Sequence, residues 1–289
     1  MEYKGTHIYC SSSVANFKNK LKKKFGFPNW NYSKLFKPTL FFGMYHKHDY
    51  KKFIIHRGKR IVFWCGSDIL NLTWKNNWIF KFFKARHYCE NEKEYYKLLK
   101  NGIIAEIKPL FLENIENFPV SYKQSDKPQV WLCIHPGREK EYGINTIFNI
   151  ANSVSNVIFH IYGIERYKPS TSLKTLSSTQ LHNTKPIEKP SNIVFHGTIS
   201  EKQLNEKIKG YQAGLRLNEF DGFSEVIAKS ILMGQYPISR IKYWGIDNYQ
   251  TEEDLTNLLK QLKYKKKPNT EIRNYWLNEL KQNENINNW

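Results

Sequence analysis

The sequence RLNEFDGFSEVIAKSILMGQYPI, residues 216–238, predicts a strand, a tight turn, a helix and a second short strand. Leu215 belongs to the first strand, and Asp221-Gly222 is a dipeptide typical of turns. Ser224 can cap the helix, and Gly234 ends it. A turn before a helix N-terminus presents free backbone N–H groups and the positive end of the helix dipole. The stretch therefore predicts an anion site that suits a phosphate.

Strand-like and helical segments alternate along the rest of the chain. The compact apolar runs 39–42 and 60–64 are typical of buried parallel strands, and residues 86–107 predict a further strand–helix–strand unit. A polar segment with two prolines, residues 114–128, separates this half from a second alternating run. The alternation predicts an α/β fold with parallel sheets. We place the domains at 1–125 and 126–268, a terminal helical segment at 269–289, and a long Ser/Thr/Lys/Pro-rich loop at 165–192.

Residues 216–238 also resemble the nucleotide-sugar motif of retaining GT-B glycosyltransferases. That motif consists of an acidic residue, Gly-Phe-Gly, apolar residues, a second Glu and a small-residue helix that ends in Gly-x-Pro-Val. Asp221 takes the first acidic position, and the segment 222–224 takes the loop. Gly234 and the segment 236–238 match the end of the motif. The second Glu, which in the family usually holds the donor ribose, is replaced by Lys229.

The resemblance covers residues 128–262 segment by segment. Gly137-Arg138 is similar to the family's Gly-Arg loop, and Tyr142-Gly143 stands where the family has Lys-Gly. Residues 192–198 look like the strand and Gly turn that pass the nucleobase. In the first half, the alternation and the segment 64–68 resemble the family. The implied fold is GT-B: two facing Rossmann-like domains with a cleft between them, the donor on the C-terminal domain and the acceptor on the N-terminal one.

The resemblance implies an enzyme that moves a sugar from a nucleotide sugar, UDP- or GDP-linked, to an acceptor hydroxyl with retention of configuration. It implies no further cofactor. In the family the acidic residue contacts the donor sugar hydroxyls, a role that falls to Asp221, while backbone N–H groups bind the diphosphate. His46 and Asp68 are the catalytic candidates of the first half. The expected donor-binding residues are Gly137, Arg138, Lys140, Gly163, His196, Gly197, Arg216, Asn218, Glu219, Gly222, Phe223, Ser224, Glu225 and Lys229.

Structural alternatives to these roles stay open. The Asp221 turn can simply cap a helix. Lys229 lies four residues after Glu225 and can form a surface pair worth roughly 0.2–0.5 kcal/mol, or it can contact the nucleotide. Arg138 can neutralise the diphosphate, whose charge grows during transfer, or lie in a solvated loop. The segment His46-Lys-His could suggest a metal, but no third ligand has suitable spacing, so no metal is expected.

The net charge of +19 is distributed unevenly. Residues 1–125 hold 23 Lys/Arg and 9 Asp/Glu, a difference of +14, whereas residues 126–289 hold 22 and 17, a difference of +5. Lysine-rich genome composition is one explanation, although it would raise lysine in both halves. Otherwise the first half is expected to face an anionic partner, either nucleic acid or a membrane surface.

Three hypotheses cover the partner of the first half. The preferred acceptor is a hydroxymethylated base in DNA, which the enzyme would extrude from the duplex. The second hypothesis is a glycolipid or polysaccharide at an anionic membrane surface. The third is a non-catalytic GT-B domain that only binds a nucleotide or glycan. The expected acceptor-binding residues are His48, Lys51, Lys52, Lys22 and Lys23.

Trp74, Trp78 and Phe82 recur at four-residue spacing among lysines. An aromatic face with this spacing is most often part of a core. A basic aromatic helix on the surface could instead rest on a membrane or stack on extruded bases.

The expected compartment is a reducing cytoplasm, including that of a virus-infected cell, with the inner membrane surface as an alternative. The N-terminal segment lacks a signal-peptide core, and no apolar run approaches the roughly 18 residues of a membrane span. The four cysteines show no metal-ligand spacing.

Overall fold

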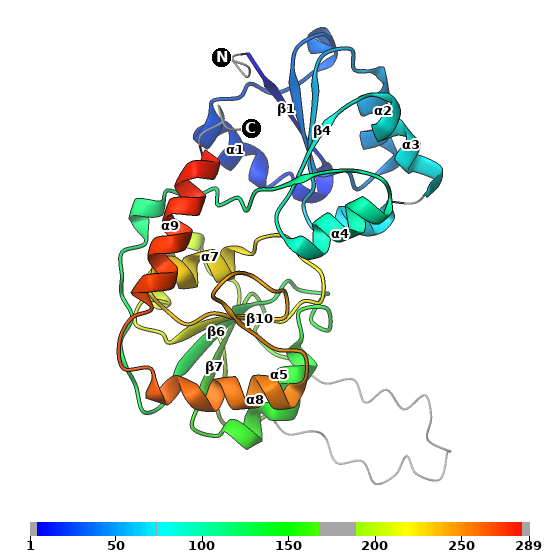
Figure 1. Cartoon of the computed structure of the whole chain (residues 1–289). Helices are drawn as coiled ribbons and strands as arrows, with labels where there is room; N and C mark the ends of the chain where they lie inside the picture. Colours follow the sequence, from blue (N-terminus) through cyan, green and yellow to red (C-terminus); the bar gives the residue numbers. More distant parts are fainter. Residues whose placement is uncertain (1–4, 73, 168–188, 285–289) are drawn as a thin grey trace, which may run out of the picture.

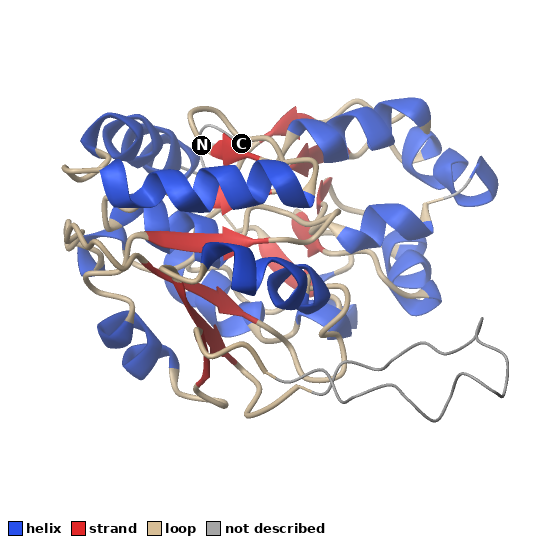
Figure 2. Ribbon diagram, turned by 90° about the horizontal axis from the view of Figure 1, so that it is seen from below, coloured by secondary structure: helices blue, strands red, loops and turns tan. Residues whose placement is uncertain are grey.

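The chain forms two α/β units, each with a parallel sheet flanked by helices (Figure 1). The computed structural model describes residues 5–72, 74–167 and 189–284. The expected loop at 165–192 and the terminal segment at 269–289 therefore fall partly outside the described residues. Figure 2 shows the strands in the interior and the helices on their outer sides. The α/β class with parallel sheets is confirmed.

The first unit contains a five-stranded sheet in the order β1-β2-β3-β4-β5, with neighbouring strands parallel. Alternate side chains point to opposite faces of a strand. Phe41 therefore packs with Phe53 in one core cluster, while Phe42 packs with Leu21 in another. The strands are β1 (His7–Cys10), β2 (Thr39–Phe42), β3 (Arg60–Phe63), β4 (Arg86–Cys89) and β5 (Glu106–Ile107), and the helices are α1 (Phe17–Phe25), α2 (Lys47–Ile55), α3 (Trp74–Phe82) and α4 (Glu92–Lys100).

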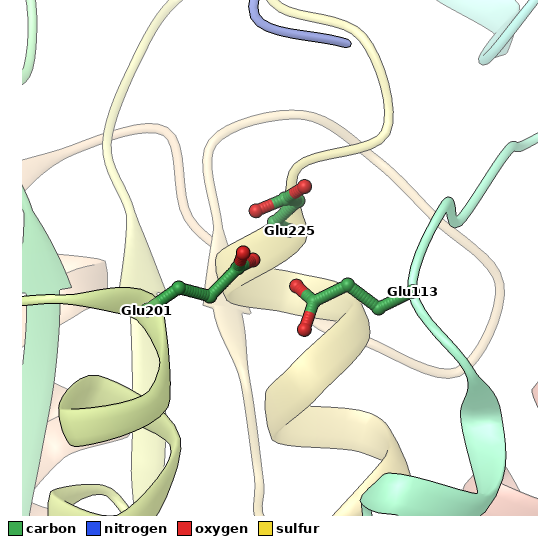
Figure 3. Close-up of side chains that lie close together, drawn as sticks. All are labelled: Glu113, Glu201 and Glu225. Carbon is green, nitrogen blue, oxygen red and sulfur yellow. The ribbon is translucent and has the colours of Figure 1, made fainter. Parts of the chain in front are cut away.

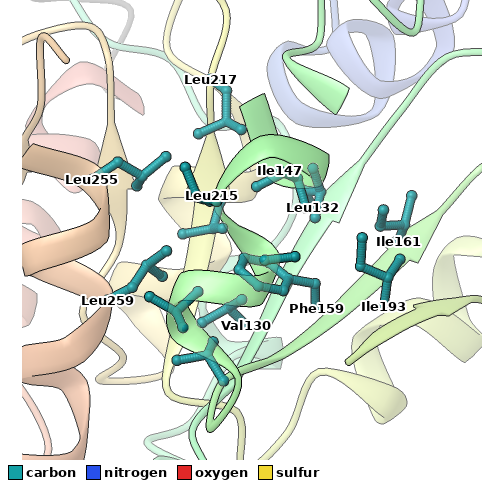
Figure 4. Packing of buried hydrophobic residues seen from close by; sticks show 14 of the residues in the cluster. Val130, Leu132, Ile147, Phe159, Ile161, Ile193, Leu215, Leu217, Leu255 and Leu259 are labelled. Atoms are coloured by element: carbon teal, nitrogen blue, oxygen red, sulfur yellow. The ribbon is translucent and has the colours of Figure 1, made fainter. Parts of the chain in front are cut away.

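The second unit contains a six-stranded sheet in the order β11-β10-β9-β6-β7-β8. Val130 and Leu132 pack with Ile147 and Leu255 on one face (Figure 4), whereas the intervening Trp131 joins the cluster on the other face. The strands are β6 (Gln129–Cys133), β7 (Ile158–Tyr162), β8 (Ile193–Phe195), β9 (Ala213–Arg216), β10 (Ile238–Ser239) and β11 (Asp247–Asn248). The helices are α5 (Ile144–Ala151), α6 (Glu201–Lys207), α7 (Glu225–Leu232), α8 (Glu252–Gln261) and α9 (Thr270–Glu284).

Helix α9 runs from the second unit to the first (Figure 1). Near its middle it is anchored by Trp276, whose ring stacks on Phe223 with the centroids 4.8 Å apart. At its end, Glu284 Oε1 lies 2.6 Å from Lys24 Nζ of α1. The helix therefore ties the second core to the first unit.

Two side chains of α3 lie on the surface. Trp78 is 53% exposed and Phe82 is 71% exposed, so the core interpretation of this aromatic face is wrong for both. The side chain of Trp74 lies outside the described residues. Within the described ranges, no helix is both long and apolar enough to cross a bilayer.

Candidate functional site

A cavity of about 700 Å³ lies between the two units and is lined by residues of both. From the first unit come Phe17, Phe42, Cys65 and Glu90, among others. From the second come the loop between β9 and α7, the end of β6 and Tyr142. The carboxyl ends of the parallel strands in both sheets point toward this cavity, which is where open α/β sheets bind ligands. We call it the cleft cavity.

The loop between β9 and α7 forms one wall of the cleft cavity. Ser224 caps α7, because its Oγ accepts a hydrogen bond from the N–H of Val226 at 3.2 Å. The loop approaches the first unit closely at Gly66, where φ is 84° and a Cβ would lie 2.8 Å from the nitrogen of Gly222. Glycine at 66 thus lets the two units close over the loop.

Asp221 is held by Arg216 from the end of β9. Its Oδ2 accepts from Arg216 Nε at 2.6 Å and lies 2.5 Å from Arg216 Nη2. The guanidinium also lies over the ring of Tyr142, 4.6 Å from its centroid. Arg216 is therefore fixed beside the loop, with its guanidinium paired to Asp221 in a charge-assisted contact.

Two residues of the first unit that directly precede α4 form hydrogen bonds with the same loop. Glu90 Oε2 accepts a hydrogen bond from the N–H of Phe223 at 3.0 Å, and Asn91 Nδ2 donates to the carbonyl oxygen of Asp221 at 2.8 Å. Burial raises the pKa of Glu90 well above its usual range, and the negative charge of Asp221 adds to the effect. Burial and Glu90 likewise raise the pKa of Glu94.

Sequence reasoning missed Glu90. The sequence signal for Glu90 was weak. Glu90 directly follows a strand, at the carboxyl edge of a parallel sheet, where ligand-binding residues are commonly found.

Five charged side chains meet beside the cleft cavity, two of which, Glu225 and Lys229, line it, and we call the five the charge cluster. Figure 3 shows Glu113, Glu201 and Glu225, whose carboxylate oxygens lie within 4.8 Å of one another. Lys229 Nζ lies 2.7 Å from Glu113, 3.3 Å from Glu201 and 3.8 Å from Glu225. Lys20 of α1 lies 2.7 Å from Glu201 and 2.8 Å from Glu225. The two ammonium groups occupy the positions that a cation would otherwise take.

Lys229 is therefore not a surface residue, and its interpretation as an exposed partner of Glu225 is wrong. Its side chain is 2% exposed, and Glu113 is the nearest of its three partners. Burial and the hydrogen bond with Glu201 raise the pKa of Glu113 to about 7, although Lys229 opposes that rise.

Half of the fourteen expected donor-binding residues lie together around Asp221. Those that line the cleft cavity with Asp221 are Gly163, Arg216, Gly222, Phe223, Ser224, Glu225 and Lys229. Those that do not line it are Gly137, Arg138, Lys140, His196, Gly197, Asn218 and Glu219. Arg138 pairs instead with Glu141 at 2.5 Å, and Glu219 pairs with Arg240 at 2.8 Å.

The expected residues of the first half lie outside the cleft cavity. His46 precedes α2 and its Nε2 lies 2.8 Å from Ser13 Oγ. Asp68 is fully buried and accepts from the N–H groups of Met44 and Cys65, both at 3.0 Å. Burial raises its pKa to about 7.

The five expected acceptor contacts are divided between a side pocket and the surface. His48 and Lys52 line a separate pocket of about 350 Å³ with Tyr9, Trp30 and Tyr32. The exposed residues Lys22, Lys23 and Lys51 line neither cavity.

No protein-family model matches the sequence, and no curated protein matches it. Solved structures do match the fold. Sucrose-phosphate synthase from Thermosynechococcus elongatus has a TM-score of 0.58 at 12% identity, covering 93% of this chain and 75% of its own. HepE from Anabaena, in complex with UDP-glucose, has a TM-score of 0.56 at 12% identity, and the match covers 84% of this chain and 77% of HepE. A mutant of TarM from S. aureus, in complex with UDP and other ligands, has a TM-score of 0.54 at 13% identity, and the match covers 86% of this chain and 55% of TarM.

The matches confirm the GT-B architecture of two facing Rossmann-like units with a cavity between them. This chain spans about half the length of TarM.

Proposed function

We propose that this chain is a glycosyltransferase whose second unit binds a nucleotide sugar. The Asp221 loop supports this most strongly, because it lines the cleft cavity at the N-terminus of an eight-residue helix and carries Arg216 beside it. A helix N-terminus and a fixed guanidinium both suit a diphosphate. The structures of HepE and TarM hold UDP-glucose or UDP, so a UDP-linked donor is the first choice.

In this proposal Asp221 contacts hydroxyls of the donor sugar, and Glu90 contacts the sugar from the first unit. The bond between the anomeric carbon and the diphosphate breaks, and the acceptor oxygen bonds to the same face of that carbon. The acceptor proton passes to the leaving phosphate, as the resemblance to retaining enzymes implies. Arg216 and the N–H groups of α7 stabilise the charge that grows on the diphosphate. The chain thus acts by positioning and by electrostatics.

Lys229 gives the proposed donor site an unusual floor. A ribose at this position would meet an ammonium group where the family places a carboxylate. We propose that Lys229 donates a hydrogen bond to a ribose oxygen and that Glu225, one turn earlier on α7, accepts from a ribose hydroxyl. Both side chains line the cleft cavity, which supports this division of roles.

The acceptor proposal follows from the first-unit wall of the cleft cavity. Its lining residues are Val14, Asn16, Phe17, Phe42, Cys65, Glu90, Leu110 and Leu112, a set without Lys or Arg. Phosphates of a DNA acceptor would need cations near the entry of the extruded base. The wall therefore favours an uncharged hydroxyl acceptor, such as a sugar of a glycolipid or polysaccharide, over a base in DNA.

A donor and acceptor panel tests the proposal. UDP, UDP-glucose, UDP-N-acetylglucosamine and GDP-mannose are measured by thermal shift, and transfer to glycan acceptors and to hydroxymethylated duplex DNA is followed by mass spectrometry. We expect UDP-sugar binding that Asp221→Asn weakens and that the exposed control Asp126→Asn leaves unchanged.

Three outcomes would change the proposal. Transfer to DNA would restore the DNA hypothesis. Donor binding without turnover would favour a non-catalytic binding module. A folded protein that binds none of the nucleotides would refute the donor site itself.

A further inference from the structure

Four cations of the first unit lie together at the edge of the sheet that faces away from the cleft cavity. A pocket of about 250 Å³ at this edge is lined by Lys59, Arg60, Lys84 and Arg86, together with Pro38, Gly58, Ile61 and Phe83. We call it the basic pocket. Its residues precede or begin β2, β3 and β4, whereas the cleft cavity lies at the carboxyl ends of the same strands. The pocket lining contains four cations and no acid.

Most of the acids of this unit lie elsewhere. Among described residues 5–107, Asp49, Asp68, Glu90, Glu92 and Glu94 follow the carboxyl ends of their strands. Glu106 begins the edge strand β5 and lies 3.7 Å from Lys108. The fold therefore separates most of the charge across the sheet, and the lining of the basic pocket is positive.

Arg60 is fixed in place at the floor of the basic pocket. Its Nε donates to the carbonyl oxygen of Phe53 at 3.1 Å, and an Nη donates to that of His56. Its guanidinium also lies over the ring of Phe83, 4.5 Å from the centroid. Burial, and the nearby charge of Arg57, lower the pKa of Arg60 from its ordinary value. An anion in the pocket would meet a cation that has already lost its conformational freedom.

Exposed phenylalanines flank the basic pocket on two sides. Phe36 is 78% exposed, and its backbone lies against Gly58, where a Cβ would approach the Phe36 carbonyl to 2.7 Å. Phe82 is 71% exposed and its ring lies 5.0 Å from that of Phe83, centroid to centroid. Trp78 lies next to Phe82, with the two ring centroids 6.4 Å apart. Rings exposed to this degree beside a basic surface are typical of protein that enters the headgroup region of a bilayer.

We propose that the basic pocket and its flanking phenylalanines dock this protein onto an anionic membrane, with a lipid phosphate in the pocket and Phe36 and Phe82 among the upper acyl chains. Charge complementarity selects an anionic surface, and the two exposed rings select a bilayer over nucleic acid, because phosphates and grooves of a duplex offer no apolar phase. Docking at this edge leaves the cleft cavity open at the opposite edge. The proposal does not depend on glycosyl transfer.

Sedimentation of the full chain with lipid vesicles at physiological ionic strength tests the proposed membrane docking. We expect binding to phosphatidylcholine vesicles that contain phosphatidylglycerol and none to phosphatidylcholine alone. Each cation is worth about fivefold in affinity near an anionic leaflet, so Lys84→Gln with Arg86→Gln should weaken binding about 25-fold. Phe36→Ser with Phe82→Ser should weaken it roughly 100-fold, at about tenfold for each ring.

The second unit supplies a matched control. Tyr264 is 68% exposed and Lys263 Nζ lies 4.8 Å from its ring centroid, so Tyr264→Ser with Lys263→Gln removes a similar pair far from the basic pocket. This variant should bind vesicles as the unaltered chain does, and unfolding temperatures should show that all variants fold. Vesicle binding that survives the phenylalanine changes would overturn the proposal. So would a failure to bind vesicles together with tight, pocket-dependent binding to duplex DNA.

Discussion

Replacing Lys229 by methionine tests whether the charge cluster stabilises the closed arrangement of the two units. Methionine keeps an unbranched apolar stem and removes the ammonium group. Lys229 Nζ lies 2.7 Å from Glu113 Oε1, and the two side chains are 2% and 12% exposed. Removal of one partner from a fully buried ion pair costs about 3–5 kcal/mol. Because Lys20 remains 3.7 Å from the same oxygen, we expect the free energy of unfolding to fall by about 2–3 kcal/mol at pH 8.

The loss should depend on pH through Glu113. Burial and Glu201 raise its pKa from 4.5 to about 7 in the folded chain. A raised pKa favours folding below the unfolded value, and this contribution is lost as pH rises from 4.5 through 7. Without Lys229 the folded pKa rises further, so the variant loses more stability between these limits. The difference between variant and unaltered chain should therefore shrink toward about pH 5.

Urea unfolding at both pH values, followed by circular dichroism and tryptophan fluorescence, measures the effect. Lys209→Met is the control, because Lys209 lies 2.7 Å from Glu206 but the pair is 39% and 64% exposed. It should change stability by less than about 0.5 kcal/mol. The reasoning fails if Lys229→Met costs less than about 1 kcal/mol at pH 8 or costs the same at both pH values.

Three further predictions concern Glu94, Trp276 and Arg216. Glu94→Gln should raise the free energy of unfolding by about 1–2 kcal/mol at pH 8 and leave it unchanged near about pH 4. The reason is that burial raises the pKa of Glu94, and its Oε1 has no hydrogen-bond partner among the described residues. Thermal unfolding across this pH range checks whether the change is stabilising. Trp276→Ala should cost about 3–5 kcal/mol in urea unfolding, because the ring is 4% exposed and stacks on Phe223. Arg216→Gln should weaken UDP binding at least about tenfold by calorimetry, because it removes a charged donor beside the loop; an unchanged affinity would exclude Arg216 from the donor site.

Short-range interactions made part of the second unit predictable from its sequence. An apolar strand, an Asp-Gly turn and a serine cap form with contacts only a few residues apart, so β9, the Asp221 loop and α7 could be predicted from one short stretch. The alternation of strands and helices then predicted parallel sheets in both halves, which the fold confirms.

Long-range pairing was beyond such reasoning. Glu90 meets Phe223 from 133 positions away, and Lys20 meets Glu225 from 205 positions away. No local pattern marks these partners, because each becomes a neighbour only when the two sheets face each other.

The sequence by itself determined the α/β class, the turn and capped helix that follow Asp221 and the excess of positive charge in the first half. The tertiary structure alone decided where those features act. It buried Lys229 among three carboxylates, since α1 and the segment around Glu113 close over α7. It also placed Lys59, Arg60, Lys84 and Arg86 at the edge opposite the cleft cavity, since parallel strands bring their amino ends together on one side of a sheet.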